Sequence, residues 1–332
     1  MTYKKIAVLS FIGLVISAPM QAFACASCGC TLSSDWENLG FSSSSGFKID
    51  VRYDYLNQNQ LRTGTHIASL SSATTGNPGA GTEIEKYTRN NYVTVGLDYS
   101  TSPDWGVNVQ LPYINRNHTT LGSSPDGVTP DDGAYHSSTS GIGDIKVIGR
   151  YQGFTEQHNF GLLFGLKLPT GSHTKTGSYT SDGTTAPIDR GLQPGSGTTD
   201  AIIGAYYVDA FNHEWGYFTQ AIVQKALDSS DGYKSGDSLN LNLGLRYQGF
   251  DDITPQIQVN ARFVEHDHGQ SADGSFATGT GGTLVYLSPG ATYRVNKQVK
   301  VYGYVQLPIY QDVNDLQLTP RWTASVGLNY TF

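Results

Sequence analysis

The chain ends in Arg321-Trp-Thr-Ala-Ser-Val-Gly-Leu-Asn-Tyr-Thr-Phe332, a stretch whose pattern recurs along the sequence. Apolar or aromatic side chains stand at every even position from Trp322 to Phe332, and polar or small ones stand at the odd positions. In an extended strand this alternation gives one apolar and one polar face. A soluble sandwich and a membrane barrel both use such strands, so the recurrence and spacing of the pattern must decide between them.

The first 24 residues predict a secretory signal peptide. Lys4 and Lys5 precede an apolar run over 6–16, and Ala22-Phe-Ala24 supplies the small residues of a cleavage site. We expect a mature chain that begins at Cys25, with a short periplasmic segment over 25–45 and a membrane domain over 46–332. Beyond the leader, no apolar run approaches the roughly 18 residues that a spanning helix needs.

The composition is that of a protein with many strands and turns. Glycine accounts for 39 of 332 residues, well above the average of about 7%, and tyrosine for 21, while charged residues make up 15%. The formal net charge is −7, which gives no reason to expect a nucleic-acid partner. All three cysteines lie within 25–30, so disulfides cannot stabilise the body of the chain.

The alternation recurs about twelve times with a regular rhythm. Intervals between successive strand starts alternate between long ones of 22 to 44 residues and short ones of 15 to 19. Hairpins with tight turns at one rim and long loops at the other produce this rhythm, which is typical of outer-membrane barrels. Both termini should then lie at the short-turn, periplasmic rim. The predicted strands start near residues 46, 90, 105, 139, 158, 199, 215, 237, 254, 281, 298 and 320.

The faces of these strands indicate a membrane barrel. In the first predicted strand, apolar Phe47, Val51 and Tyr53 alternate with charged Asp50 and Arg52. The other clear strands show the same alternation. Aromatic residues gather near strand ends, as in interfacial girdles, and apolar faces of about nine to eleven residues match a tilted bilayer crossing. Closure would leave no unpaired edge in hydrocarbon. We predict an all-β fold: a closed antiparallel up-and-down transmembrane β-barrel of about 12 strands in the bacterial outer membrane.

The charged faces should then line the barrel interior, where the selectivity of a channel is set. Basic residues outnumber acidic ones there, which favours anionic or polar small solutes. The alternative is that these charges pair across neighbouring strands and stiffen a wet interior. The expected lumen-lining residues are Lys48, Asp50, Arg52, Asp54, Asp98, Asp144, Lys146, Arg150, Lys167, Arg246 and Arg262.

Four short segments resemble a known family. They are Gly141-Ile-Gly-Asp144, Leu168-Pro-Thr-Gly171, Gly191-Leu-Gln-Pro-Gly-Ser-Gly197 with Asp200, and Leu287-Ser-Pro-Gly290. Together they resemble the outer-membrane barrel family of phenol-degradation meta-pathway transporters. The resemblance implies an outer-membrane channel or transporter. Phe332 likewise resembles the C-terminal signal that such barrels present to the barrel-assembly machinery.

Two parts of the chain leave the orientation of side chains open. Around 199–207, the pairs Ile202-Ile203 and Tyr206-Tyr207 place apolar groups on both faces. His136 and Ser138 have the spacing of a hydrolytic pair on one strand face. In 145–151 the odd positions are apolar and should face lipid. If the strand continues back to 136 without interruption, His136 and Ser138 face inward, away from any lipid substrate. We therefore expect no enzymatic activity.

The cysteines form the most unusual motif. Cys25, Cys28 and Cys30 are spaced closely enough to chelate a soft cation such as Cu(I) or Zn(II). A disulfide with one remaining thiol, an inert tail, and lipidation of Cys25 are the alternatives. Histidines and carboxylates in the long loops could collect cations or, more simply, contact lipopolysaccharide through divalent ions.

These observations predict a channel that passes small solutes through a polar, mixed-charge lumen, with membrane lipid and lipopolysaccharide around it and no cofactor. The alternative is a metal-handling outer-membrane component that uses the three cysteines. The solute, the direction of transport and the oligomeric state do not follow from the sequence.

Overall fold

The computed structural model describes residues 45–69, 85–120, 134–180, 182–269 and 279–332. The predicted signal peptide and cysteine motif lie outside these residues. Across them the named secondary-structure elements are β-strands, apart from one 3-10 turn, η1 (Arg190–Leu192). The strands are β1 (Gly46–Gly64), β2 (His66–Ile67), β3 (Glu85–Ser100), β4 (Trp105–Thr120), β5 (Tyr135–Ile142), β6 (Ile145–Tyr151), β7 (Phe160–Leu168), β8 (Thr176–Tyr179), β9 (Thr185–Pro187), β10 (Asp200–Ala210), β11 (Trp215–Ala226), β12 (Tyr233–Lys234), β13 (Ser238–Tyr247), β14 (Ile253–Val264), β15 (His268–Gly269), β16 (Gly282–Arg294) and β17 (Val299–Thr331).

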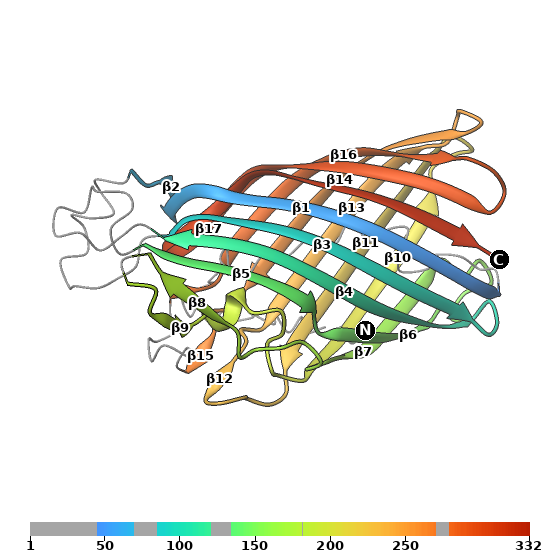
Figure 1. Cartoon of the computed structure of the whole chain (residues 1–332). Coiled ribbons are helices and arrows are strands. Elements are labelled where there is room, and N and C mark those ends of the chain that lie inside the picture. Colours follow the sequence, from blue (N-terminus) through green and yellow to red (C-terminus); the bar gives the residue numbers. More distant parts are fainter. Residues whose placement is uncertain (1–44, 70–84, 121–133, 181, 270–278) are drawn as a thin grey trace, which may run out of the picture.

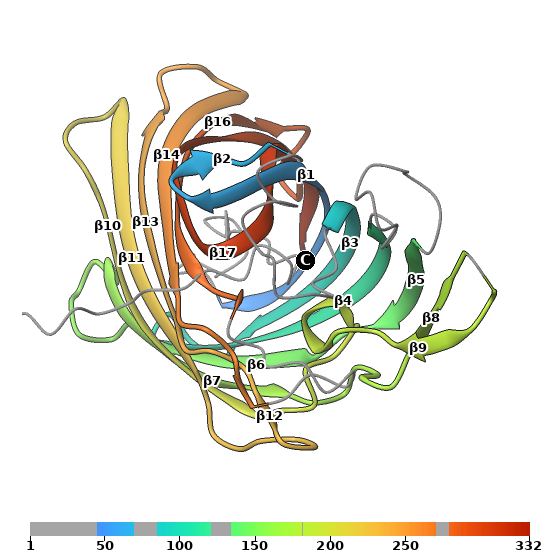
Figure 2. The same cartoon turned by 90° about the vertical axis from the view of Figure 1, so that its left-hand side faces the viewer.

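The long strands close into a ring (Figures 1 and 2). Each pairs antiparallel with its neighbours in the order β1, β3, β4, β6, β7, β10, β11, β13, β14, β16 and β17, and β17 returns to β1. An all-antiparallel ring needs an even number of passes, and these are eleven elements, so one of them must reverse. The predicted closed antiparallel barrel is confirmed.

β17 is the element that reverses direction. Its first part, up to Val313, pairs with β16, and its second part, from Val313, pairs with β1. The two parts lie side by side, because Thr323 Oγ1 donates to Gln306 Oε1 at 2.7 Å. Asp315 has φ +40°, as a tight turn requires. The ring therefore has twelve passes, as predicted, with a hairpin where a longer loop before residue 320 was expected.

The fourth pass is interrupted by a β-bulge. β5 and β6 both pair with β4, but Tyr113 opposes Ile142 whereas Gln110 opposes Lys146, so one extra residue sits on the β5–β6 side. Because side chains alternate with a period of two, one extra residue exchanges the faces. Beyond the bulge, β5 pairs with β8 on its other edge rather than with β7. In Figure 2, β5, β8 and β9 lie to one side of the ring.

The short turns are stabilised by side chains that accept hydrogen bonds from the backbone. Ser102 Oγ accepts a hydrogen bond from the backbone N–H of Trp105 at 3.3 Å, and Asn212 Oδ1 accepts one from Trp215 at 2.9 Å. Asn296 Oδ1 does the same for Val299 at 2.9 Å. Such side-chain caps mimic a backbone turn and hold two strands in a tight hairpin. All three turns lie at the rim where the chain ends (Figure 1).

Aromatic rings form a band near this rim. Trp105 packs on Tyr151 with ring centroids 4.6 Å apart, and Trp215 packs on Tyr247 at 5.1 Å. Phe332 contacts Phe47 at 6.2 Å, and its backbone N–H donates to the Phe47 carbonyl, which joins the end of the chain to its first strand. Amphipathic rings at one level around a barrel are typical of a membrane–water interface.

The barrel carries apolar side chains outside and polar ones inside. On β13, Leu241, Leu243 and Leu245 are 38 to 54% exposed, whereas Asn242 between them is 5% exposed. A water-soluble barrel would have the opposite arrangement. The surface is therefore that of a transmembrane barrel, and the protein belongs in the bacterial outer membrane, as predicted. Within the described residues, no helix is long and apolar enough to cross a membrane.

The ambiguous stretch at 199–207 is resolved by its packing. Ile202 and Tyr206 are buried inside the barrel against Ile148 and Leu163, whereas Ile203 is 66% exposed. Gly161 makes room for the Tyr206 ring, since a Cβ there would lie 2.3 Å from it. The interior thus contains an apolar cluster at this strand. The sequence here therefore has apolar residues on both faces of the strand, one set toward the cluster and the other toward lipid.

Candidate functional site

Ten of the eleven residues expected to line the lumen lie on strands of the ring, and Asp144 lies between β5 and β6. Asp50, Arg52, Asp54, Asp98, Arg150 and Lys167 are buried. Asp144 has only 8% of its side chain exposed. Lys48, Lys146, Arg246 and Arg262 are half-buried.

Many of these charges are paired or hydrogen-bonded, either within one strand or across strands. Arg52 Nε donates to Asp54 Oδ2 at 2.8 Å, and Arg150 Nη1 lies 3.2 Å from Asp98 Oδ2. Both oxygens of Asp50 accept from the Tyr302 hydroxyl at 3.0 Å. Buried charges persist only when they are neutralised and hydrogen-bonded. Such contacts between interior charges are the ones that the pairing alternative describes.

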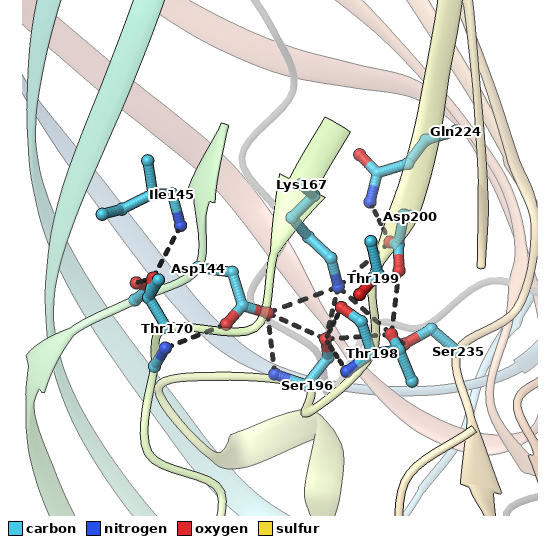
Figure 3. Close-up of polar contacts among 12 residues, drawn as sticks. Asp144, Ile145, Lys167, Thr170, Ser196, Thr198, Thr199, Asp200, Gln224 and Ser235 are labelled. Atoms are coloured by element: carbon cyan, nitrogen blue, oxygen red, sulfur yellow. Dashed lines mark hydrogen bonds and ion pairs between the residues drawn. The ribbon is translucent and has the colours of Figure 1, made fainter. Parts of the chain in front are cut away.

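Lys167 is the centre of the most extensive cluster (Figure 3). Its Nζ lies 3.3 Å from Asp144 Oδ2 and 3.0 Å from Asp200 Oδ2, and it also donates to the hydroxyl groups of Ser196 and Thr198. Asp200 in turn accepts from Thr198 Oγ1 at 2.8 Å and from Gln224 Nε2 at 2.6 Å. One buried ammonium group thus holds two carboxylates that come from the bulge and from the start of β10.

Three of the four segments that resemble the transporter family converge on Asp144. Its Oδ1 accepts from the Gly171 backbone at 3.0 Å, and its Oδ2 accepts from the Ser196 backbone at 2.9 Å and the Ser196 hydroxyl at 2.8 Å. The backbones of Gly171 and Gly195 touch, because a Cβ on Gly195 would lie 2.3 Å from the Gly171 carbonyl oxygen. The glycines in these motifs therefore allow three chain segments to pack around one carboxylate.

Two arginines hold segment 188–199 inside the barrel. Arg116 on β4 donates to the Gly191 carbonyl at 2.8 Å, to Asn90 Oδ1 at 2.5 Å and to the Tyr92 hydroxyl at 2.7 Å. Arg190 binds the Ser230 carbonyl at 3.1 Å and Asp231 Oδ2 at 3.0 Å. Its guanidinium lowers the pKa of Asp231, a group of the loop between β11 and β13. The segment is thus tied to β4 and to the loop between β11 and β13.

Sequence reasoning missed Arg116, Arg190 and Asp200 as interior charged residues. Arg116 lies at the edge of what reads as a loop, and Arg190 lies within one, so neither belongs to a clear alternating pattern. The glycine-rich segment 191–197 was the available signal, since repeated glycines indicate close approach of backbones.

A cavity of about 310 Å³ lies beside this cluster, within the barrel. Its walls come from eight strands of the ring and from segment 190–196. Five basic side chains and three acidic ones line it: Lys146, Lys167, Arg116, Arg190, Arg262, Asp144, Asp200 and Asp267.

Asp267 is buried at the edge of the cavity, outside the strands of the ring. Its carboxylate accepts from the Tyr233 hydroxyl and from the Gly236 backbone, both at 2.8 Å. Burial nevertheless raises its pKa above the ordinary value of 3.8. In the sequence Glu265-His-Asp-His268, the Asp267 carboxylate is therefore buried and is not available to cations outside the barrel.

The expected inward orientation of His136 and Ser138 is wrong. Both are exposed, while Ser137 and Thr139 between and beside them are buried. The cause is the bulge before β6, which reverses the faces of β5. His136 Nδ1 lies 2.7 Å from Thr119 Oγ1, so its ring is bound to the adjacent strand.

The cysteine prediction falls outside the described residues and stays a prediction. Within the described ranges, no group of three or more His, Cys, Asp or Glu side chains is placed to hold a metal ion.

Comparisons with known proteins support the fold. No family model matches the sequence, and no curated protein does. The COG4313 outer membrane channel from Pseudomonas putida F1 superposes with a TM-score of 0.60 at 15% identity, over 87% of this chain and 96% of that chain. The CymD monoaromatic hydrocarbon channel gives 0.49 at 10% identity, over 94% and 98%. The Pseudomonas putida toluene transporter TodX gives 0.42 at 12% identity, over 88% and 90%. The first likeness shows a shared barrel fold.

Proposed function

We propose that this protein is an outer-membrane channel that passes small solutes through a polar interior of mixed charge. The observation that supports it best is the combination of a lipid-facing apolar wall with a charged, partly hollow interior. The COG4313 protein that shares the fold is described as an outer membrane channel, which agrees with the proposal. The finer assignment to transporters of phenol degradation rests on the motif resemblance alone.

Segment 188–199 is the part of the chain that we propose narrows the path. It lies inside the barrel beside the cavity, and Arg116 fixes it through the Gly191 carbonyl. Because charged hydrogen bonds of this kind contribute about 1.5–3 kcal/mol each, loss of Arg116 should free the segment to move. The basic majority of the cavity lining should favour anions over cations in the path.

Planar-bilayer recordings of the folded protein test this function. We expect ion-conducting steps with a reversal potential on the anion-selective side, and a larger single-channel conductance for Arg116→Ala. The matched control is Arg89→Ala, since Arg89 is exposed on the neighbouring strand β3. A protein that inserts but does not conduct contradicts the channel, and strong cation selectivity contradicts the basic path.

A further inference from the structure

The cavity in the barrel interior is amphipathic, which a purely water-filled path does not require. Apolar side chains from five strands form one part of its wall: Ile114, Ile148, Ile202, Ile222 and Val264. Four of them are buried, and only Ile222 is partly exposed. Clefts that bind small organic molecules combine such apolar walls with a few polar groups, at volumes of about 300–1,000 Å³.

The polar part of the wall includes two adjacent groups with unmet hydrogen-bonding capacity. Arg262 on β14 and Asn240 on β13 are directly opposed in the ladder, and both line the cavity. Within the described part of the chain, the buried Nε of Arg262 and the buried Oδ1 of Asn240 have no hydrogen-bond partner. Buried polar atoms are nearly always satisfied, so such a pair needs an explanation.

Arg262 has no ion pair among the described residues, whereas three other cations that line the same cavity bind carboxylates or a carbonyl group. Lys167 has two carboxylates, Arg190 has Asp231, and Arg116 has the Gly191 carbonyl. The acidic residues of the cavity are already engaged as well, since Asp144 and Asp200 flank Lys167 and Asp267 accepts from Tyr233. The Arg262 guanidinium therefore lies beside apolar surface, while the carboxylates that line the cavity are bound to other residues.

We propose that this cavity binds a small organic anion with an apolar body, such as an aromatic or short aliphatic carboxylate. The Arg262 guanidinium donates to the anionic group, while the isoleucine side chains cover the apolar body. Guanidinium–carboxylate hydrogen bonds are among the strongest in proteins, which makes Arg262 the residue that selects the charge. The inference rests on the proposed channel, for which it names the class of solute.

Isothermal titration of the folded full-length protein with 4-phenylbutyrate tests the site. 4-Phenylbutanol has the same body without the charge, and acetate has the charge without the body. We expect 4-phenylbutyrate to bind at least about tenfold more tightly than either, because a hydrogen bond to a charged group and a buried ring each contribute a factor of that order. Equal affinity for phenylbutyrate and phenylbutanol, or no binding of phenylbutyrate, would overturn the proposal.

Variants assign the binding to named residues. Arg262→Met keeps the side-chain volume and should weaken phenylbutyrate binding about tenfold or more. Arg294→Met is the control, since Arg294 lies 53% exposed at the short-turn rim, and it should bind as the unaltered chain does. Arg262→Lys keeps the charge and should retain the preference for the anion, and Ile222→Ala should weaken phenylbutyrate but not acetate. Unchanged binding by Arg262→Met contradicts the site.

The conductance of the unaltered protein in potassium chloride is measured separately. If the protein binds phenylbutyrate through Arg262 but does not conduct, the binding site is supported and the proposed channel is contradicted. If the protein conducts but binds phenylbutyrate and phenylbutanol equally, the channel is supported and the binding site is contradicted.

Discussion

At the scale of single residues, buried charge is the feature that most constrains this barrel. Lys167 lies between Asp144 and Asp200, and all three side chains are at most 8% exposed. Both carboxylates lie within ion-pair distance of this one ammonium group, so its removal leaves two buried carboxylates without a counter-charge. The same interior holds Arg262 without such a partner among the described residues, which is why the two positions should respond differently to loss of charge.

Replacing Lys167 by Met should lower the free energy of unfolding by about 3–5 kcal/mol, because two carboxylates remain buried without a counter-charge. Urea unfolding of the barrel in lipid vesicles measures this change. Adding Asp144→Asn and Asp200→Asn to the variant should restore most of the lost stability. Lys225→Met is the control, since Lys225 is 61% exposed, and it should change the midpoint little. A Lys167→Met barrel as stable as the original argues against the ion cluster.

Asp267 should make stability depend on pH in a defined direction. Its folded-state pKa is raised by burial, so the folded state favours the protonated acid. The contribution of this group to stability is therefore greatest below 3.8 and is lost as the pH rises through the raised pKa. The difference in urea midpoint between the native chain and Asp267→Asn, followed from pH 4 to pH 8, should grow in favour of the variant. A flat difference contradicts this.

At the scale of elements, the bulge between β5 and β6 determines which residues face outward. Ile142 opposes Tyr113 and Lys146 opposes Gln110, so the faces exchange at Gly143-Asp144. The exchange also places Asp144 where Gly171 and Ser196 can donate to it. One extra residue thus links the wall of the barrel to the charged cluster inside it.

Cysteine accessibility tests the exchange of faces directly. In a chain whose native cysteines are replaced by serine, Ser138→Cys should react with a maleimide added outside, because Ser138 is exposed. Ser137→Cys should react slowly, since Ser137 is 7% exposed. The opposite order of reactivity would mean that the strand runs without a bulge.

The sequence predicts the strands better than the site. Alternation in stretches such as 47–54 is strict, so the number of passes and the interior side of Asp50, Arg52 and Asp54 follow from a period of two. The bulge has no such signature, because a single extra residue between two regular strands leaves both patterns intact. Arg116 contacts Gly191, 75 positions away, and a contact of that separation depends on the folded backbone.

At the scale of the whole molecule, the protein is a closed wall of twelve antiparallel passes around a mostly polar interior. The hydrogen-bonded chain Gln220, Asn242, Asn260 and Ser288 crosses four strands on the inner face. On the opposite face of the same strands, apolar side chains are exposed, among them Val223, Leu243, Ile257 and Tyr293. This inversion, rather than any single site, is what makes the molecule a membrane protein.

The most direct measurement of this inversion uses spin labels at adjacent positions of β13, with the protein folded in lipid vesicles. A label at residue 243 should collide often with oxygen, which concentrates in lipid, and rarely with a polar nickel complex. A label at residue 242 should collide with oxygen far less. If residue 242 proves the more accessible to oxygen, or if the two do not differ, the apolar face does not contact lipid and the account is wrong.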